Sequence, residues 1–516
     1  MSLQGDRHRW WTLVAVCGAT FMLLVDVTIV QVALPTIQRE MHASFSDLQW
    51  VIDAYAVSLA ALILTSGSLA DHYGRKRVFL GGVGIFTIAS ALCGAAANPG
   101  MLLASRAFQG IGGAAMFATS LALIGQEFSG RERATAIAAW SATVGGAVAI
   151  GPLVGGALTS GVGWRWIFYV NVPIGIVTFI LTTVKTVNVR DPGALSLDWG
   201  GLVTFSGSLF LFVFGLVRGE LAGWSNPVVL AMFTSAAALL VAFVMVELRH
   251  PRPMFDLSLF RKRSFTGVSI STFLIGAGTF ALLPFLTFYF QNYLGASPLV
   301  GGEYLLPSTM LAFIVPLATR RMTEAMPPAV ALSGGLGLTA IGVLLMSGLS
   351  IHSNWTALVP GMIVFGTGIG LANPAIAKIG LGVVDPRRSG MASGLSNTFR
   401  IGGLATGIAG LGAFFQDRLA ARLAPAAGSA SSHLADVVAS GGIRAAASAS
   451  HRNPGIIAAS RHAFVLGMND LFILGAVIAG VAAVVGLAMV RNHDFVTAVP
   501  TAAREQAAPS ASAELV

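Results

Sequence analysis

The sequence predicts an all-α protein that crosses a membrane about fourteen times, and three observations support this fold class. The chain of 516 residues is 55% hydrophobic and only 10% charged, whereas soluble domains carry about 25% charged residues. Apolar stretches long enough for a spanning helix of about 20 residues recur along the whole chain. The loops between these stretches alternate between strongly basic and nearly uncharged.

Each predicted span is a mostly apolar segment bounded by polar or turn-forming residues. The first span is longer than the apolar core of a signal peptide, which has about 7–15 residues. The predicted spans are 10–34, 48–70, 78–97, 101–124, 135–159, 164–187, 198–217, 227–248, 265–291, 299–319, 328–350, 355–382, 391–415 and 463–490.

The basic loops predict the orientation in the membrane. The short loops of the nearly uncharged set hold only Arg39 and Arg218. By the positive-inside rule, the basic loops and both termini are cytoplasmic, which fits a multi-pass protein of the plasma membrane. The net charge of +9 therefore reflects topology and does not indicate nucleic-acid binding. The basic set contains Arg7, Arg9, Arg75, Lys76, Arg77, Arg131, Arg133, Arg190, Arg249, Arg252, Arg261, Lys262, Arg263, Arg320, Arg321, Arg387, Arg388 and Arg491.

An internal repeat divides the chain into two six-helix halves. The stretch "RERATAIAAWSATVGG" (131–146) resembles "RRSGMASGLSNTFRIGG" (387–403), and aligning Arg131 with Arg388 also aligns both glycine pairs. Many secondary transporters are built from such repeats. We therefore expect an N-terminal half (1–187), a two-helix insert (198–248) and a C-terminal half (265–490). We further expect a long Ala/Ser/Gly-rich outer loop (416–462) with short surface helices, and a cytoplasmic tail (491–516).

Three motifs combine glycine or proline with charged or polar residues. "GSLADHYGRKR" (67–77) ends the second span, where Gly67 permits close helix approach and Asp71 pairs with Arg75 or faces a helix N-terminus; a purely topogenic basic loop is the alternative. "RAFQGIGGAAM" (106–116) opens the fourth span, and its glycines indicate helix packing because no strand precedes them as in a phosphate loop. "GGAVAIGPLVGGAL" (145–158) predicts a bent helix with a flat packing face.

These motifs resemble the signatures of the major facilitator superfamily, specifically its fourteen-helix drug:proton antiporters. Further matching stretches are "LVDVTIVQVALP" (24–35), "WRWIFYVNVPIG" (164–175), "LDWGG" (197–201) and "LFRKRSF" (259–265). The resemblance covers roughly 10–415 and the last span. The motifs are highly specific for the family and much less specific for the substrate.

The resemblance implies a role for each matching residue. The matches are Gly67, Asp71, Gly74, Arg75 and Arg77 for the cytoplasmic gating loop, Arg106, Gln109 and Gly110 for proton transfer, and Gly151, Pro152, Gly155 and Gly156 for the antiporter motif. Ala147 stands where the family has a further glycine, a change of one small residue for another. "PLATRRMTEAM" (316–326) is a degraded second copy of the gating loop.

Asp26 is the most deeply placed acid, ~12 Å below the outer end of the first predicted span. An ionised carboxylate there costs several kcal/mol unless it faces protein or water. A salt bridge with Arg106 that only fixes packing is one explanation. The other is proton coupling by Asp26, with Asp53 assisting and Arg106 tuning its protonation. Burial raises the pKa of a carboxyl group and a nearby cation lowers it, so a conformational change that alters either one links protonation to conformation. We interpret Glu303, near the outer end of its span, as solvated or as a helix cap.

The sequence thus predicts a proton-coupled antiporter that exports amphipathic drugs or antibiotics by alternating access, not an enzyme. No predicted span contains a histidine, so we expect no histidine relay. No nucleotide-binding phosphate loop exists, so we expect the proton gradient and not ATP to supply the energy. Two cysteines provide no disulfide framework, no metal site and no cofactor site. Gln31, Phe280, Phe288 and Tyr289 are candidate cavity residues, with lipid-facing aromatics as the alternative. We expect a monomer, with a dedicated natural-product or lipid exporter, uptake symport, or a non-transporting membrane sensor or scaffold as alternative functions.

Overall fold

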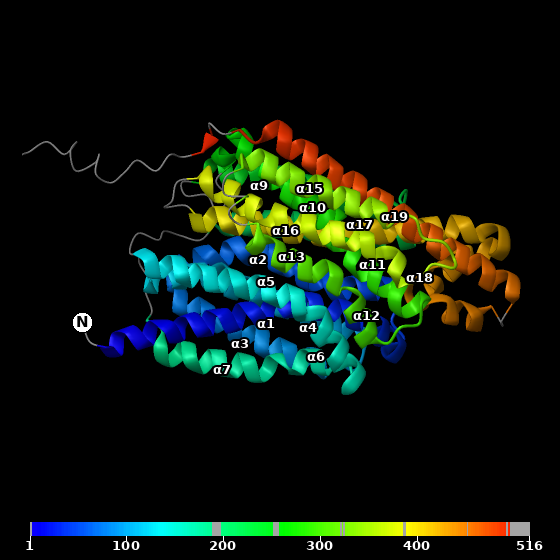
Figure 1. Ribbon diagram of the computed structural model, residues 1–516, viewed down its shortest axis with the longest axis horizontal. Coiled ribbons are helices and arrows are strands. Elements are labelled where there is room, and N and C mark those ends of the chain that lie inside the picture. The colour runs from blue at the N-terminus through cyan, green and yellow to red at the C-terminus, as the bar shows by residue number, and fades with distance from the viewer. Residues whose placement is uncertain are drawn as a thin grey trace, which may run out of the picture.

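The computed structural model describes residues 3–128, 130–187, 198–250, 257–319, 322, 326–384, 389–450, 453–491 and 494–495. Within these ranges the regular structure is helical and contains no strand. Thirteen helices are long and apolar enough to cross a membrane, and a bent pair of helices raises the number to fourteen. The long helices run side by side along one axis of the molecule (Figure 1). The predicted all-α membrane fold is therefore confirmed.

The N-terminal bundle contains six spanning helices, of which the sixth is α7 preceded by the single turn α6. Local sequence explains where the helices begin. Ser44 and Asp47 form a capping box at the start of α2, and Asn98 caps α4 just before Pro99. Gly74 joins α2 to α3 at a φ of 101°, a conformation that favours glycine. The elements are α1 (Leu3–Met41), α2 (Phe45–Tyr73), α3 (Arg75–Gly94), α4 (Pro99–Glu127), α5 (Gly130–Gly161), α6 (Trp166–Tyr169) and α7 (Asn171–Lys185).

The two-helix insert and the C-terminal bundle follow. The insert consists of α8 (Trp199–Ala222) and α9 (Pro227–Arg249). The C-terminal bundle contains η1 (Leu257–Arg261), α10 (Arg263–Gly278), η2 (Phe280–Leu282), α11 (Leu283–Phe288), η3 (Tyr289–Tyr293), α12 (Pro298–Tyr304), α13 (Leu306–Ala318), α15 (Pro328–Leu345), η4 (Trp355–Leu358), α16 (Val359–Gly382), α17 (Ser389–Ala427), η6 (Gly428–Ala430), α18 (Ser431–Ala449) and α19 (Pro454–Met489).

Two predicted continuous spans are interrupted. The span 265–291 is divided among α10, η2, α11 and the π-helical turn η3, and α10 ends next to Thr279, whose φ of −123° and ψ of −61° are not helical. The span 299–319 is divided between α12 and α13, which meet at an angle of 43°. Pro284 and Pro307 begin the helices after these breaks, as expected for residues without a backbone N–H.

The segment 416–462 is not a loop with short surface helices. α17 continues to Ala427 and is 39 residues long, and α18 adds a further 19 residues before α19 begins at Pro454. Ala435, Val438 and Ala439 of α18 are buried, so this helix packs against the bundle. We call the end of the molecule with α18 the hairpin end. The opposite end, where Arg75–Arg77 begin α3, is the basic end.

The two bundles contact each other mainly at the hairpin end. There α12 packs on α5, and α17 packs on α2. Gln291 Nε2 donates to the Val32 carbonyl at 2.7 Å, and Gln49 Nε2 donates to the Ile408 carbonyl at 3.2 Å. Toward the basic end, Ser141 and Ala142 of α5 are exposed. The described residues thus form a bundle that is closed at the hairpin end.

The insert covers the junction between the bundles. α8 contacts both α2 and α17, whereas α9 packs mainly on α8 and is largely exposed. Trp50 of α2 packs on the rings of Phe210 and Phe214. A small apolar cluster joins the three helices through Ala56 and Val57 of α2, Val213 and Val217 of α8, and Ala405 and Ala409 of α17. We call this three-helix contact the seam.

Candidate functional site

Asp26 and Arg106 form a fully buried ion pair at the centre of the N-terminal bundle. Arg106 Nη1 lies 2.5 Å from Asp26 Oδ2, and the two side chains are 1% and 0% exposed. Asp26 lies mid-way along the apolar span Arg9–Met41 of α1, and Arg106 lies on the second turn of α4. The two charges lie close enough in depth on neighbouring helices for the long arginine side chain to reach the carboxylate, which is the pairing offered as one explanation of Asp26.

Neutral polar groups from three helices complete this pair. Asp26 Oδ1 accepts from Gln109 Nε2 at 3.0 Å and from Asn171 Nδ2 at 3.2 Å. Ser90 Oγ accepts from the same two amides and donates to the Phe168 carbonyl. The carboxylate therefore has three hydrogen-bond donors in a buried site.

The guanidinium of Arg106 is equally well surrounded. Its Nε donates to the Val51 carbonyl at 2.9 Å, and its Nη1 donates to Gln109 Oε1 at 2.7 Å. The ring of Tyr55 lies 4.3 Å from its central carbon, a cation–π distance. The side chain of Arg106 therefore ends inside the bundle and does not reach the surface of the molecule.

Asp53 is buried in a very different environment. Its side chain is 0% exposed, and neither carboxylate oxygen has a hydrogen-bond partner among the described residues. Asp53 lies three residues after Trp50 and four before Val57 on α2, so these three side chains share a helix face. That face is the one that meets α8 and α17 at the seam. Asp53 is therefore a buried acid at the junction of the two bundles.

The glycines of the fourth span pack helices together. A Cβ on Gly110 would lie 2.5 Å from the Tyr55 carbonyl oxygen of α2, and a Cβ on Gly112 would meet the backbone of Phe86 in α3. Both residues lie inside the continuous helix α4. The structure thus confirms the helix-packing interpretation of this motif and provides no phosphate-binding loop there.

The antiporter motif forms a contact between the bundles. Gly151 and Gly155 pack against Thr28 and Ile29 of α1, without space for a side chain. Gly156 packs against the backbone of Pro298 in α12. Pro152 lies inside α5, where it removes one backbone hydrogen bond. The flat face predicted for this helix therefore seals α5 to both α1 and α12.

The gating loop is only partly described. Gly74 forms the turn, Arg75 Nη1 donates to the Ala122 carbonyl of α4 at 3.2 Å, and Arg77 is exposed. A Cβ on Gly67 would meet no heavy atom of the described chain within 4 Å, so the close helix approach expected there is absent from this conformation. The side chain of Asp71 and residues 320–321 and 323–325 of the second copy lie outside the described residues.

The candidate cavity residues are buried in packed regions. Tyr289 stacks on Tyr293 and donates to the Ser353 carbonyl, and the ring of Phe288 lies 5.7 Å from that of Phe45. Gln31 is 4% exposed, whereas Phe280 is half-buried. Phe288 and Tyr289 therefore face neither lipid nor an open cavity here, and their contact with substrate stays a prediction. Glu303 is exposed, consistent with a solvated acid.

A family model described as Major Facilitator Superfamily matches residues 16–408. The chain belongs to the major facilitator superfamily. It is a membrane transporter and not an enzyme. Its relatives include the multidrug resistance protein Stp of Mycobacterium tuberculosis, which is 33% identical over 81% of this chain and 78% of that protein. The puromycin resistance protein of Streptomyces alboniger is 34% identical over 81% of this chain and 84% of that protein.

Two further comparisons cover almost the whole chain. The tetracenomycin C resistance and export protein of Streptomyces glaucescens is 30% identical over 94% of this chain and 92% of that protein. A bacterial homologue of the human lysosomal transporter Spinster, solved in an inward-facing conformation, matches with a TM-score of 0.64 at 19% identity. That match covers 95% of this chain and 99% of the Spinster homologue. It supports the major facilitator fold alone.

Sequence reasoning missed two residues of the central network of this transporter. Ser90 and Asn171 are neutral and lie in apolar runs, so no charge marks them. Asn171 belongs to the stretch "WRWIFYVNVPIG", and its polar amide inside that apolar run was the available signal. No group of three or more metal-binding side chains occurs in the described part of the chain.

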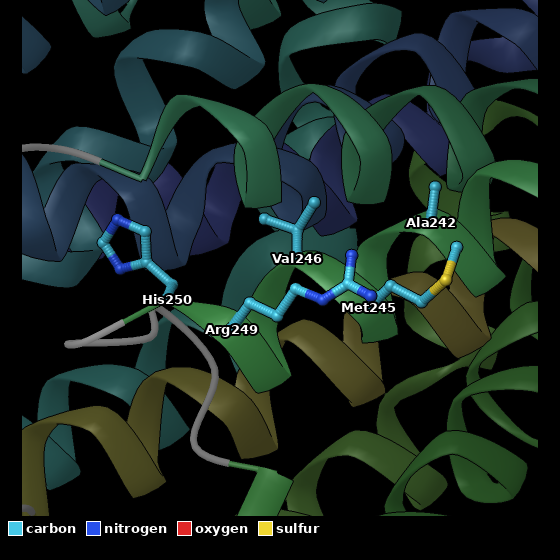
Figure 2. A pocket seen from close by; sticks show the side chains of 5 residues that line it. All are labelled: Ala242, Met245, Val246, Arg249 and His250. Atoms are coloured by element: carbon cyan, nitrogen blue, oxygen red, sulfur yellow. The ribbon is translucent and has the colours of Figure 1, made fainter.

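A surface pocket of about 400 Å³ lies apart from these residues. It is lined by Ala242, Met245, Val246, Arg249 and His250 at the basic end of α9 (Figure 2). None of the predicted site residues contributes to it. Since α9 is the most exposed helix of the insert, this pocket is separate from the bundle interior.

Proposed function

We propose that this protein exports small amphipathic molecules from the cytoplasm in exchange for protons. Its family and the resistance and export proteins among its relatives support transport of small molecules outward. The observation that carries proton coupling is the contrast between its two buried acids. Asp26 is fully compensated by Arg106 and two amides, whereas Asp53 has no described partner.

Asp53 carries a proton in the closed conformation. An ionised carboxylate that is buried without a donor costs several kcal/mol, whereas a protonated carboxyl group costs much less. Closing the seam therefore requires Asp53 to be protonated first. When the seam opens at the hairpin end, water reaches the carboxyl group and allows it to exchange its proton.

Asp26 and Arg106 are the second component of the coupling mechanism. Their pair joins α1 to α4, while Gln109 and Asn171 connect it to α4 and α7. Movement of α1 relative to α4 would separate the charges and favour protonation of Asp26. We keep Asp26 as the main coupling acid, with Arg106 controlling its protonation and Asp53 linking protonation to closure.

A closed hairpin end corresponds to an inward-facing conformation in the orientation that we assign. We place the basic end in the cytoplasm and the hairpin end outside the plasma membrane, in accordance with the positive-inside rule. The transporter acts as a monomer, in which residues 1–187 and 265–490 rock against each other. Arg75 and the gating loop close the basic end when the hairpin end opens.

Proteoliposomes with an imposed pH gradient provide the experiment. Puromycin and tetracenomycin C, which appear in the names of two relatives, are the first compounds of the panel. We expect a pH gradient to drive accumulation of at least one panel compound and an uncoupler to abolish it. Accumulation of a single compound would indicate a dedicated exporter. Equal fluxes with and without the gradient would contradict proton coupling, and no flux of any compound would favour a sensor or scaffold.

A further inference from the structure

Arg400 is a cation inside the membrane that the proton-coupling residues do not explain. It lies on α17, six residues or about 9 Å beyond Gly394, where the apolar part of this helix begins. A charged side chain at such a depth is costly unless it is paired or faces a water-filled space. Intramembrane arginines are therefore functional candidates by default.

The contacts of α17 with its neighbouring helices show on which side of α17 Arg400 lies. Gly403 and Gly407 pack against α10, and Ser396 lies against Gly380 of α16. On the opposite side, Ala405 and Ala409 pack on α2 and α8 at the seam.

At 100° per residue, Arg400 and Asn397 fall in the sector between α10 and α2. Because α2 belongs to the N-terminal bundle and α10 to the C-terminal bundle, this sector opens toward the space between the bundles, not toward lipid.

Arg400 has little compensation in this position. Its Nη2 donates to Asn397 Oδ1 at 2.6 Å. No acidic side chain of the described chain lies within ion-pair distance of it. A guanidinium has five N–H donors in a planar fork that matches a carboxylate or a sulfonate. The side chain is half-buried, so it combines accessibility with reduced solvent screening.

We propose that Arg400 binds a negatively charged group on amphipathic substrates and so makes the transporter selective for organic anions. Asn397 orients the guanidinium through the hydrogen bond to its Oδ1. In the sequence repeat Arg400 corresponds to Thr143 of α5. Of these two equivalent positions, the one in the C-terminal bundle carries the cation. This inference rests on the proposed export function, because the anion is the exported molecule.

An ion pair with Asp53 that forms in another conformation is the competing explanation. Gln49 of α2 contacts Ile408 of α17, and the two helices run in opposite directions. Asp53 therefore lies more than one turn nearer the hairpin end than Arg400. If the two residues paired in another conformation, neutralising Arg400 would affect all substrates equally. Recognition of an anion predicts an effect that depends on the charge of the substrate.

Two fluorescent probes of nearly identical shape distinguish these explanations. The probe 8-anilinonaphthalene-1-sulfonate is an amphipathic anion, and N-phenyl-1-naphthylamine lacks the sulfonate. Binding of each is measured to the full-length protein in nanodiscs, with empty nanodiscs as background. The variants are Arg400→Gln, Arg400→Met and Arg400→Lys. Arg418→Gln, on the exposed part of α17, is the matched control. Arg418 pairs with Asp470, and Asp470 keeps its second ion pair with Arg422 when Arg418 is replaced.

We expect Arg400→Gln to weaken binding of the anionic probe about tenfold or more, as for loss of a charge-assisted pair. Binding of the neutral probe should change by less than about twofold, and Arg418→Gln should change neither. Arg400→Lys should retain part of the anion affinity because it keeps the charge without the planar fork. Arg400→Met, similar in length and apolar, provides the same measurement if the glutamine variant does not fold.

Equal changes in the affinity for the two probes, or no change in the affinity for the anionic probe, would overturn the role of Arg400. The proposed export function is checked separately by pH-driven export of the neutral probe. If the parent and Arg400→Gln both export it while the variant also binds the anion normally, only the inference on Arg400 fails. If the parent exports neither probe in a pH gradient, the proposed function fails for these compounds whatever Arg400 binds.

Discussion

Gly302 of α12 packs directly on the Pro152 carbonyl of α5, and four residues along α5 Gly156 packs on the Pro298 carbonyl of α12. The two helices belong to different bundles, so each contributes a glycine to a contact between backbones. The antiporter motif therefore supplies half of the closed hairpin end. Leu299 N–H adds a hydrogen bond to Ser160 Oγ of α5 at 3.0 Å, next to this contact.

A single methyl group at this contact should disfavour the closed hairpin end. Overpacking costs about 1–3 kcal/mol, which corresponds to a population shift of roughly five- to 150-fold. We expect Gly156→Ala to lower transport by a comparable factor. Spin labels at Ala95 and His352, both exposed at the hairpin end, should report a longer distance. Gly146→Ala is the control, because a Cβ there meets no described atom within 4 Å. Unchanged distances in Gly156→Ala would contradict this role.

The sequence was sufficient to predict the number of spans and to offer the ion pair as one explanation of Asp26. Hydropathy places Asp26 and Arg106 within about one helical turn of each other in depth, which makes a pair possible. Hydropathy does not report rotation about a helix axis. The position of Asp53 at the seam depends on which face of α2 meets α8, and no single-span pattern contains that information.

Other features were hidden by composition. The segment 416–462 is rich in alanine and serine, so its helices α17, α18 and α19 continue where the hydropathy signal ends. Arg400 was overlooked as a site residue although the predicted span 391–415 contains it. The repeat around it was interpreted only as a basic loop that enters a small-residue helix, and its neighbours became known only with the packing of α17.

Removing one member of the buried ion pair should be more harmful than removing both. Arg106→Gln leaves the Asp26 carboxylate without its cation, which costs about 3–5 kcal/mol in buried sites. The double variant Asp26→Asn/Arg106→Gln leaves only neutral groups with hydrogen-bond partners. We therefore expect the double variant to melt at a higher temperature in detergent than Arg106→Gln alone. A double variant that is no more stable than the single one would show that the two charges are not coupled.

Neutralising the gating loop should abolish transport without unfolding the protein. Arg75 joins the start of α3 to the end of α4 through the Ala122 carbonyl. We expect Arg75→Ala and Asp71→Asn to reach the membrane at normal levels and to lose export. Lys76→Gln is the control, since its ammonium contacts only the exposed Thr183 carbonyl among the described residues. Near-normal export by both gating variants would refute the assignment.

Exposed and buried positions of the two insert helices should differ in their contact with lipid. Val213 and Val217 of α8 are buried at the seam, whereas Val241 of α9 and Val203 of α8 are 58% and 63% exposed. Cysteines at the exposed positions should react with a lipid-soluble maleimide and be unaffected by substrate. Cysteines at Val213 and Val217 should react slowly, because both positions are buried at the seam. Protection by substrate at Val203 would place α8 in the transport pathway.

Proton release by the purified protein on adding a transported compound is the direct test of proton coupling by Asp26 and Asp53. The measurement uses a pH-sensitive dye in weakly buffered detergent solution. The parent protein should release protons, because substrate binding favours conformations in which the coupling acids ionise. Asp53→Asn and Asp26→Asn should each release fewer protons while still binding the compound, since asparagine preserves the shape of the side chain. If both variants release as many protons as the parent, neither acid couples protons to transport and the account is wrong.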